Sequence, residues 1–259
     1  MEDIKELRKI CQLPRKAYDT WYGLNVCRKI SIYITRVILP FGVSADFVTL
    51  IFLAVGVLAC FFFAIGTKLS FLIGIIVLQL WYVLDHVDGE VARYRKSSSI
   101  TGVYFDKFAH YLVHPSVFFC LGWGAYKSMG IQYAVIVGYI SGISNILISA
   151  TEDLKESTIL SKLIRDGNTV NFGKEEGKKP GEEKSIIKIL FSSIHKICIF
   201  PQAMNIISLA VILNILGFKK IILWVLFVYA ILMTLVWTTR LMQFVRTKRI
   251  DAELGGLLK

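Results

Sequence analysis

Six apolar stretches, each close to the length that crosses a bilayer, dominate this 259-residue chain. A helix needs about 20 apolar residues to span a hydrocarbon core of about 30 Å. Hydrophobic residues make up 55% of the chain and its mean hydropathy is +0.59, which is more apolar than a soluble domain of this size. The sequence therefore predicts an all-α, polytopic membrane protein with six transmembrane helices. They are expected near Phe47–Gly66, Leu69–Arg93, Val103–Tyr126, Ile131–Ala150, Gln202–Gly217 and Ile221–Trp237.

The segment from Val26 to Phe41 has the pattern of an amphipathic helix that lies in the membrane interface. Its apolar residues recur at helical spacing, whereas Arg28, Lys29 and Arg36 fall off that face. A seventh span is the alternative interpretation, but it would bury three basic residues in the membrane. The chain is accordingly divided into an N-terminal cytoplasmic segment with this helix at 1–45, a six-helix domain at 46–245 with a cytoplasmic loop at 151–200, and a cytoplasmic tail at 246–259.

The positive charge lies mostly on one side of this predicted arrangement. With both termini on the same side, 26 of the 30 Lys and Arg residues fall there and 4 on the other. Cytoplasmic segments have such an excess, so both termini are predicted to be cytoplasmic. A net charge of +11 would suggest nucleic acid as a partner of a soluble protein. Here its distribution indicates membrane topology instead, and no nucleic-acid partner is expected.

The fourth predicted span has small residues on one face. Gly138 and Gly142 are four residues apart, and Ser141 and Ser144 lie beside them. Small residues allow two helix backbones to approach closely in a membrane. The pattern predicts close packing within the bundle, with a dimer interface as the alternative.

Three aspartates lie where the second and third predicted spans meet the charge-rich side. From Asp85 to His110 the chain reads D-x2-D-G-x2-A-R-x8-G-x3-D-x3-H. Helical spacing places Asp85 and Asp88 on one face, and Gly102, Asp106 and His110 on one face of the next helix. Charged side chains are costly in a membrane. A divalent metal is the simplest reason for three carboxylates, because Mg²⁺ prefers oxygen ligands.

This pattern resembles the signature of the CDP-alcohol phosphotransferase family of integral membrane enzymes, which are CDP-alcohol phosphatidyltransferases of class I. That signature is D-x2-D-G-x2-A-R-x7–8-G-x3-D-x3-D. Every fixed position matches except the last, where the family has Asp and this chain has His110. The resemblance implies transfer of a substituted phosphate group from a CDP-alcohol to an acceptor hydroxyl, with release of CMP, in the biosynthesis of phospholipids or related phosphodiesters. It also implies a pair of Mg²⁺ or Mn²⁺ ions and a homodimer. Because the three aspartates lie on the charge-rich side, the active site is predicted to face the cytoplasm.

The resemblance implies a role for each matched position. The carboxylates would be metal ligands, and they are Asp85, Asp88 and Asp106. The small residues and the arginine would line the site of the CDP moiety, and they are Gly89, Ala92, Arg93 and Gly102. His110 stands at the position of the catalytic base. Because an imidazole titrates near pH 6.5, roughly, it suits a general base at neutral pH, and it could also coordinate the metal.

Other functions stay open on the sequence alone. A catalytically silent family member would bind a CDP-alcohol or a metal as a scaffold or sensor, and His110 is the argument for it. A metal-ion transporter is disfavoured, because the acidic residues gather at one face of the membrane instead of spreading through its depth. The acceptor also stays open between a phosphorylated alcohol, another polar alcohol such as serine, and a lipid hydroxyl. Basic residues that would suit a phosphorylated acceptor are Arg28, Arg165 and Arg240.

Overall fold

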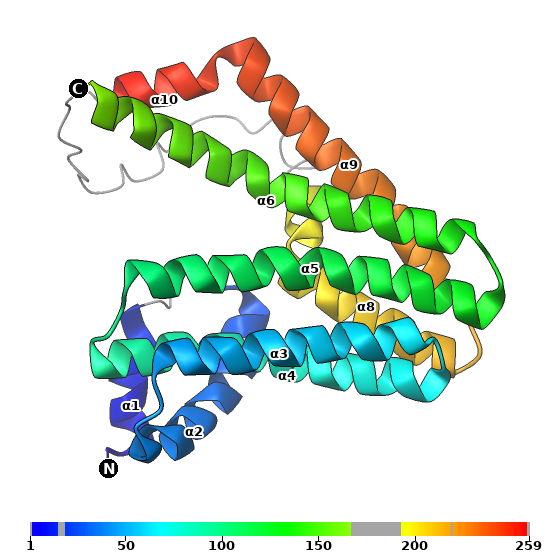
Figure 1. The fold of residues 1–259 in the computed structure, drawn as a ribbon, viewed down its shortest axis with the longest axis horizontal. Coiled ribbons are helices and arrows are strands. Elements are labelled where there is room, and N and C mark those ends of the chain that lie inside the picture. The colour runs from blue at the N-terminus through cyan, green and yellow to red at the C-terminus, as the bar shows by residue number, and fades with distance from the viewer. Residues whose placement is uncertain (1, 15–18, 167–192, 219, 258–259) are drawn as a thin grey trace.

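The chain is built of helices, as its computed structural model shows (Figure 1). The structure describes all residues except 1, 15–18, 167–192, 219 and 258–259. No strand occurs among the described residues. In chain order the elements are α1 (Ile4–Cys11), the π-helical turn η2 (Gly23–Cys27), α2 (Arg28–Ile38), the 3-10 turn η3 (Leu39–Phe41), α3 (Ala45–Ile65), α4 (Lys68–Arg95), α5 (Ile100–Met129), α6 (Tyr133–Arg165), α8 (Phe200–Ile215), α9 (Ile221–Thr247) and α10 (Arg249–Leu257).

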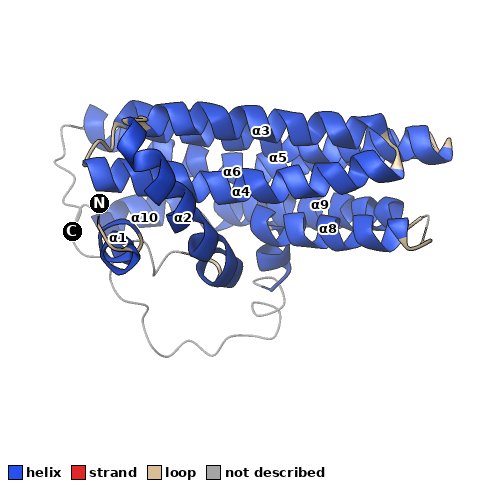
Figure 2. Cartoon of the chain, turned by 90° about the horizontal axis from the view of Figure 1, so that it is seen from below, coloured by secondary structure: helices blue, strands red, loops and turns tan. Residues whose placement is uncertain are grey.

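The long helices form a bundle that holds the polar motif (Figures 1 and 2). Helix α3 packs against both α4 and α5, α6 packs on α5, and α9 packs on α6 and α8. The six predicted spans coincide with α3, α4, α5, α6, α8 and α9. By length and composition α3, α4, α6 and α9 could each cross a membrane, whereas α8 is apolar but has only 16 residues. An all-α polytopic membrane protein is thus confirmed, and the count of six spans stays a prediction.

A short turn joins the two helices that bear the motif. Helix α4 ends at Arg95, and the next residue, Lys96, adopts the left-handed conformation with φ of 52°. Ser99 then caps α5, because its hydroxyl accepts a hydrogen bond from the backbone N–H of Gly102 at 2.9 Å. The two helices therefore run antiparallel, and the motif residues of α4 face those of α5.

The amphipathic segment packs with its polar residues toward the protein. Ser31 and Thr35 of α2 are fully buried against α4, whereas Ile30, Val37 and Phe41 are exposed. In water this orientation would be unfavourable, because apolar surface is left unburied. At a membrane surface it places the apolar face toward lipid, which fits the predicted interfacial helix.

The segment predicted as a cytoplasmic loop at 151–200 begins as helix. Helix α6 continues to Arg165, well past the predicted end of the fourth span. Its extension has no apolar face of membrane length, but ion pairs stabilise it, including one from Lys155 to Glu253 of α10 at 3.2 Å. Residues 193–198 are also helical. The remainder of that loop lies outside the described residues.

Small residues permit close contact between α5 and α6. A Cβ atom on Gly138 would lie 2.8 Å from the carbonyl oxygen of Phe118, and one on Gly142 would lie 2.7 Å from that of Pro115. Both values are too short for real contacts, so the backbones approach as closely as glycine allows. The predicted small-residue face is thus used within the bundle.

We expect Gly124→Ala to destabilise the bundle. A Cβ atom there would overlap the backbone carbonyl oxygen of Phe63 on α3 and would lie 2.9 Å from the ring of Phe71 on α4. Overpacking of this kind costs about 1–3 kcal/mol. The measurement is the midpoint of thermal inactivation in detergent. Gly255→Ala is the control, because that glycine on α10 faces open space, and an unchanged midpoint for Gly124→Ala would contradict the packing.

Candidate active site

The two halves of the motif meet between α4 and α5. His110 Nε2 lies 2.9 Å from Asp85 Oδ1 and 3.3 Å from Asp106 Oδ1. Ligand atoms of these three residues all lie within 4.8 Å of one another. The helical spacing of Asp106 and His110 therefore places both side chains on the predicted face, opposite Asp85. Among the residues that the structure describes, this is the cluster suited to a metal ion.

The donor set of this cluster fits Mg²⁺ or Mn²⁺. It offers two carboxylates and one imidazole, and carboxylate oxygens are the ligands that these hard cations prefer. Asp106 Oδ1 is buried and accepts no hydrogen bond. A buried polar atom without a hydrogen-bond partner is costly. A cation at the centre of the cluster would satisfy it.

Asp88 lies beside this cluster and is only 8% exposed. Its Oδ2 accepts a hydrogen bond from Thr49 Oγ1 of α3 at 3.0 Å, and its Oδ1 contacts the backbone N–H of Gly89. The carboxylate borders the same pocket as Asp106. Of the three predicted carboxylate ligands, Asp85 and Asp106 thus converge directly, and Asp88 lies next to them in the pocket wall.

A pocket of about 330 Å³ opens beside the aspartates, between the start of α3, the end of α4 and the start of α5. The turn between α4 and α5 supplies three serines to its rim. The four residues predicted for the CDP moiety all line it, and they are Gly89, Ala92, Arg93 and Gly102. The structure therefore brings the four residues predicted for the CDP moiety into one cavity, together with Asp88 and Asp106.

Arg93 folds back over the pocket. A Cβ atom on Gly89 would lie 3.0 Å from one terminal nitrogen of the Arg93 guanidinium, so the glycine leaves space for that group. The guanidinium Nε donates to the backbone carbonyl of Cys11 at the end of α1. Helix α1 thus positions the arginine that the resemblance assigns to the site of the CDP moiety, and the sequence did not predict this contact.

His114 is a neighbour of the site that lies outside the sequence motif. Its Nε2 lies 3.0 Å from His110 Nδ1. The His114 ring also stacks on Phe200 of α8, with centroids 3.7 Å apart and planes 9° apart. Both nitrogens of His110 are therefore engaged, one by the carboxylates and the other by His114. The two histidines are four residues apart, and this helical spacing is the sequence signal that could have predicted their contact.

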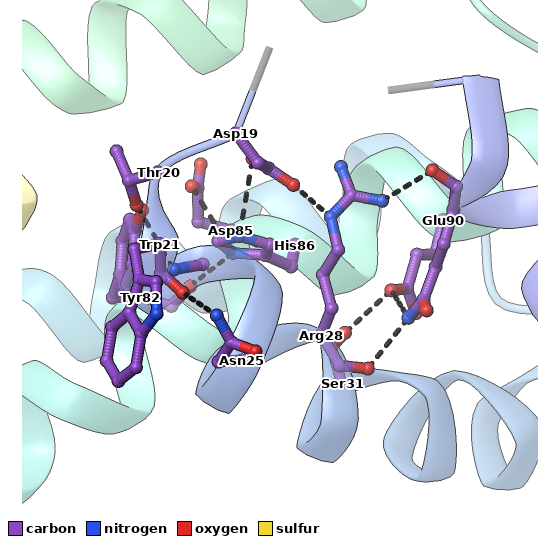
Figure 3. Close-up of polar contacts among 12 residues, drawn as sticks. Asp19, Thr20, Trp21, Asn25, Arg28, Ser31, Tyr82, Asp85, His86 and Glu90 are labelled. Carbon is purple, nitrogen blue, oxygen red and sulfur yellow. Dashed lines mark hydrogen bonds and ion pairs between the residues drawn. The ribbon is translucent and has the colours of Figure 1, made fainter. Parts of the chain in front are cut away.

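The N-terminal helices α1 and α2 pack against α4, and polar contacts join them to it (Figure 3). Glu90, which is 0% exposed, accepts hydrogen bonds from Gln12 at 2.7 Å and from Ser31 and Thr35 at 2.6 Å each. Arg28 forms an ion pair with Asp19. Because Arg28 already has a carboxylate partner, it belongs to the interface between these elements and α4.

Asp19 also approaches the motif itself. Its Oδ1 lies 4.0 Å from His86 Nε2, and His86 Nδ1 lies 3.9 Å from Asp85 Oδ2 (Figure 3). His86 additionally contacts the carbonyl oxygen of Tyr82 through Nδ1 at 2.9 Å. The contact of Asp19 with His86 could not be predicted from the sequence, because the two residues are 67 positions apart.

Known proteins share both the motif region and the fold. Residues 43–162 match the family described as CDP-alcohol phosphatidyltransferase. A crystal structure of phosphatidylinositol phosphate synthase from Mycobacterium tuberculosis with CDP-DAG bound is similar, with 19% identity, a TM-score of 0.55 and coverage of 83% of this chain and 92% of that one. A structure of the same enzyme with manganese and citrate gives 17% identity, a TM-score of 0.55 and coverage of 84% and 90%.

These matches agree with the geometry of the site. At such identities the likeness to the solved structures shows a shared fold. A comparison with curated proteins found no match. The matched range 43–162 contains α3, α4, α5 and most of α6, and therefore the whole motif. Residues 43–162 are therefore identified as a CDP-alcohol phosphatidyltransferase domain, which supports the transfer of a substituted phosphate group from a CDP-alcohol in phospholipid synthesis.

Proposed function

We propose that this transfer depends on divalent metal, Mg²⁺ or Mn²⁺, held as a pair of ions by Asp85, Asp88 and Asp106. The observation that supports this most strongly is the convergence of Asp85, Asp106 and His110 at the edge of the pocket. Three carboxylates so close together repel one another unless cations compensate their charge. When bound, the ions would stabilise the charge of the phosphoryl group and of its attacking and leaving oxygens.

The residues of the pocket suit a cytidine diphosphate group. Gly89, Ala92 and Gly102 leave room for the nucleotide to approach the helix backbones. The planar Arg93 guanidinium can contact a phosphate through two hydrogen bonds at once. Its hydrogen bond to the Cys11 carbonyl fixes its direction before the substrate binds, which lowers the entropy cost of binding.

His110 acts as the general base in this proposal. The acceptor oxygen forms a bond to the phosphorus that bears the alcohol, and the bond from that phosphorus to the bridging oxygen of CMP breaks. CMP leaves with that electron pair, and the acceptor proton passes to His110 Nε2. The oxygens of Asp85 and Asp106, at 2.9 and 3.3 Å, would stabilise the imidazolium that forms. His114 holds the ring through its other nitrogen.

We also propose that the site faces the cytoplasm. Helices α1, α2 and α10 lie at the same end of the bundle as the turn between α4 and α5 (Figures 1 and 2). This end has the excess of Lys and Arg that is typical of cytoplasmic segments. The homodimer that the family resemblance implies stays a prediction.

The donor site can be tested by thermal shift on the detergent-purified protein. We expect CDP and Mg²⁺ together to raise the unfolding temperature more than either alone, because a ligand that binds only the folded state stabilises it. CMP and ADP serve as comparison nucleotides. Asp85→Asn should lose the joint effect, whereas Asp166→Asn, at the far end of α6, should retain it.

The same samples separate an enzyme from a silent relative. Release of CMP from a CDP-alcohol in the presence of an acceptor supports the transferase. Joint binding of CDP and Mg²⁺ without turnover of any CDP-alcohol would favour a scaffold or sensor. Absence of any nucleotide effect in well-folded protein would count against the donor site itself.

A further inference from the structure

Two further cavities, which adjoin each other, begin at His110 and extend away from the pocket assigned to CDP. The first has a volume of about 200 Å³ and includes His110, His114 and Lys107 in its wall. The second has a volume of about 470 Å³ and reaches Arg240 and residues 193–198. His114, Asn145 and Ser149 line both, so the two cavities adjoin. Together they extend from His110, the proposed base, to Arg240 on α9.

In the walls of these two cavities, the lysine and the arginine each contact an acidic side chain. Lys107 Nζ lies 3.1 Å from Asp153 Oδ1, and the Tyr111 hydroxyl donates to Asp153 Oδ2 at 3.0 Å. A guanidinium nitrogen of Arg240 lies 3.0 Å from Glu152 Oε1. The formal charges of these side chains therefore cancel.

The surroundings of Arg240 add no positive charge to the wall. Another guanidinium nitrogen of Arg240 lies 3.0 Å from His195 Nε2. Burial, together with the nearby Arg240, lowers the pKa of His195 below its ordinary value, so that this ring is neutral at neutral pH. Lys155 binds the other oxygen of Glu152 at 3.2 Å, but it also pairs with Glu253 at 3.2 Å.

We propose that these cavities receive the acceptor, and that the acceptor is a small polar alcohol without a phosphate group. This inference rests on the proposed function. A phosphate would have to displace Glu152 from Arg240 or Asp153 from Lys107, and it would then face both carboxylates. Like charges brought together at a binding site oppose binding strongly. Hydroxyl groups, by contrast, can hydrogen-bond to Asn145 and Ser149 without separating an ion pair.

The paired charges also decide between acceptor classes that the sequence alone leaves open. Arg28, Arg165 and Arg240 were considered for a phosphorylated acceptor because each is basic and near the cytoplasmic side. In the structure Arg28 contacts Asp19, and Arg240 contacts Glu152. Arg165 ends α6 and lines neither cavity.

The test is CMP release from CDP-diacylglycerol with Mg²⁺, above the rate with water alone. Acceptors are offered in matched pairs that differ by one phosphate: glycerol and glycerol 3-phosphate, inositol and inositol 1-phosphate, and serine and phosphoserine. We expect the unphosphorylated member of at least one pair to be used with a kcat/KM about tenfold higher or more, which corresponds to one ion pair kept intact.

Two variants test whether the carboxylates set this preference. Glu152→Gln frees Arg240, and Asp153→Asn frees Lys107. Each is expected to lower the preference for the unphosphorylated acceptor by about tenfold. The matched control is Asp166→Asn, which removes a carboxylate near the end of α6 that pairs with Lys162 away from both cavities. The preference should not change in this control.

Several outcomes would overturn the inference. The unaltered protein could prefer a phosphorylated acceptor, or no unphosphorylated acceptor could raise CMP release above the rate with water. The preference could also stay unchanged in both carboxylate variants. The thermal shift with CDP and Mg²⁺ is measured on the same samples. If CDP and Mg²⁺ together still stabilise the protein, such a result rejects only the inference about the acceptor. If they do not stabilise the unaltered protein, the result counts against the proposed function.

Discussion

Asp106→Asn is expected to lower the rate of CMP release by about 1,000-fold or more at saturating CDP-alcohol. Metal stabilisation of a phosphoryl transition state is worth several kcal/mol, and each 1.36 kcal/mol corresponds to a factor of ten in rate. Asp106 Oδ1 is buried, accepts no hydrogen bond and lies 3.3 Å from His110 Nε2. An amide at this position has the same shape but lacks the charge that would hold the cation.

The measurement is the initial rate of CMP release over a range of Mg²⁺ and Mn²⁺ concentrations. Removal of metal from unaltered protein with EDTA should reproduce the loss, and added Mg²⁺ should restore the rate. Asp166→Asn again serves as the matched control, because its carboxylate lies outside the site. A rate within tenfold of normal for Asp106→Asn, at unchanged metal dependence, would show that Asp106 is not a ligand.

The helices of the bundle could be predicted because apolar length is a local property of the sequence. The stretch at 47–66 contains no charged residue, and it appears as α3 almost at its predicted bounds. The convergence of Asp85 with Asp106 and His110 could also be predicted. It needs only helical spacing and a short turn, and the structure has both.

Contacts between distant elements could not be predicted in the same way. Glu90 lies inside the motif at a position that the pattern does not specify, and its partners Gln12, Ser31 and Thr35 are 78, 59 and 55 residues away. No periodicity in the sequence indicates which side of α4 the N-terminal helices cover. The pairing of Arg240 with Glu152 likewise depends on how α9 meets the extension of α6.

His110→Ala is expected to lower kcat by about 10²–10⁴-fold, the range typical of a general base, while the joint binding of CDP and Mg²⁺ is retained. The alanine removes the nitrogen that faces Asp85 Oδ1 at 2.9 Å and Asp106 Oδ1 at 3.3 Å. It leaves the carboxylates in place. The measurements are kcat for CMP release and the thermal shift with CDP and Mg²⁺.

His110→Asp is the informative companion variant, because it restores the residue that the family has at this position. If His110 is the base, a carboxylate should replace part of its function, and this variant should be faster than His110→Ala. The fourth carboxylate also adds negative charge near Asp85 and Asp106, which favours binding of the cation. The rate of CMP release by His110→Asp should therefore saturate at a lower Mg²⁺ concentration. If His110 only packs against His114 and Trp81, the opposite order is expected, because alanine removes these contacts without burying a new charge. Near-normal turnover of His110→Ala would therefore reject the base, and equal losses in both variants would point to a role that requires the imidazole ring itself.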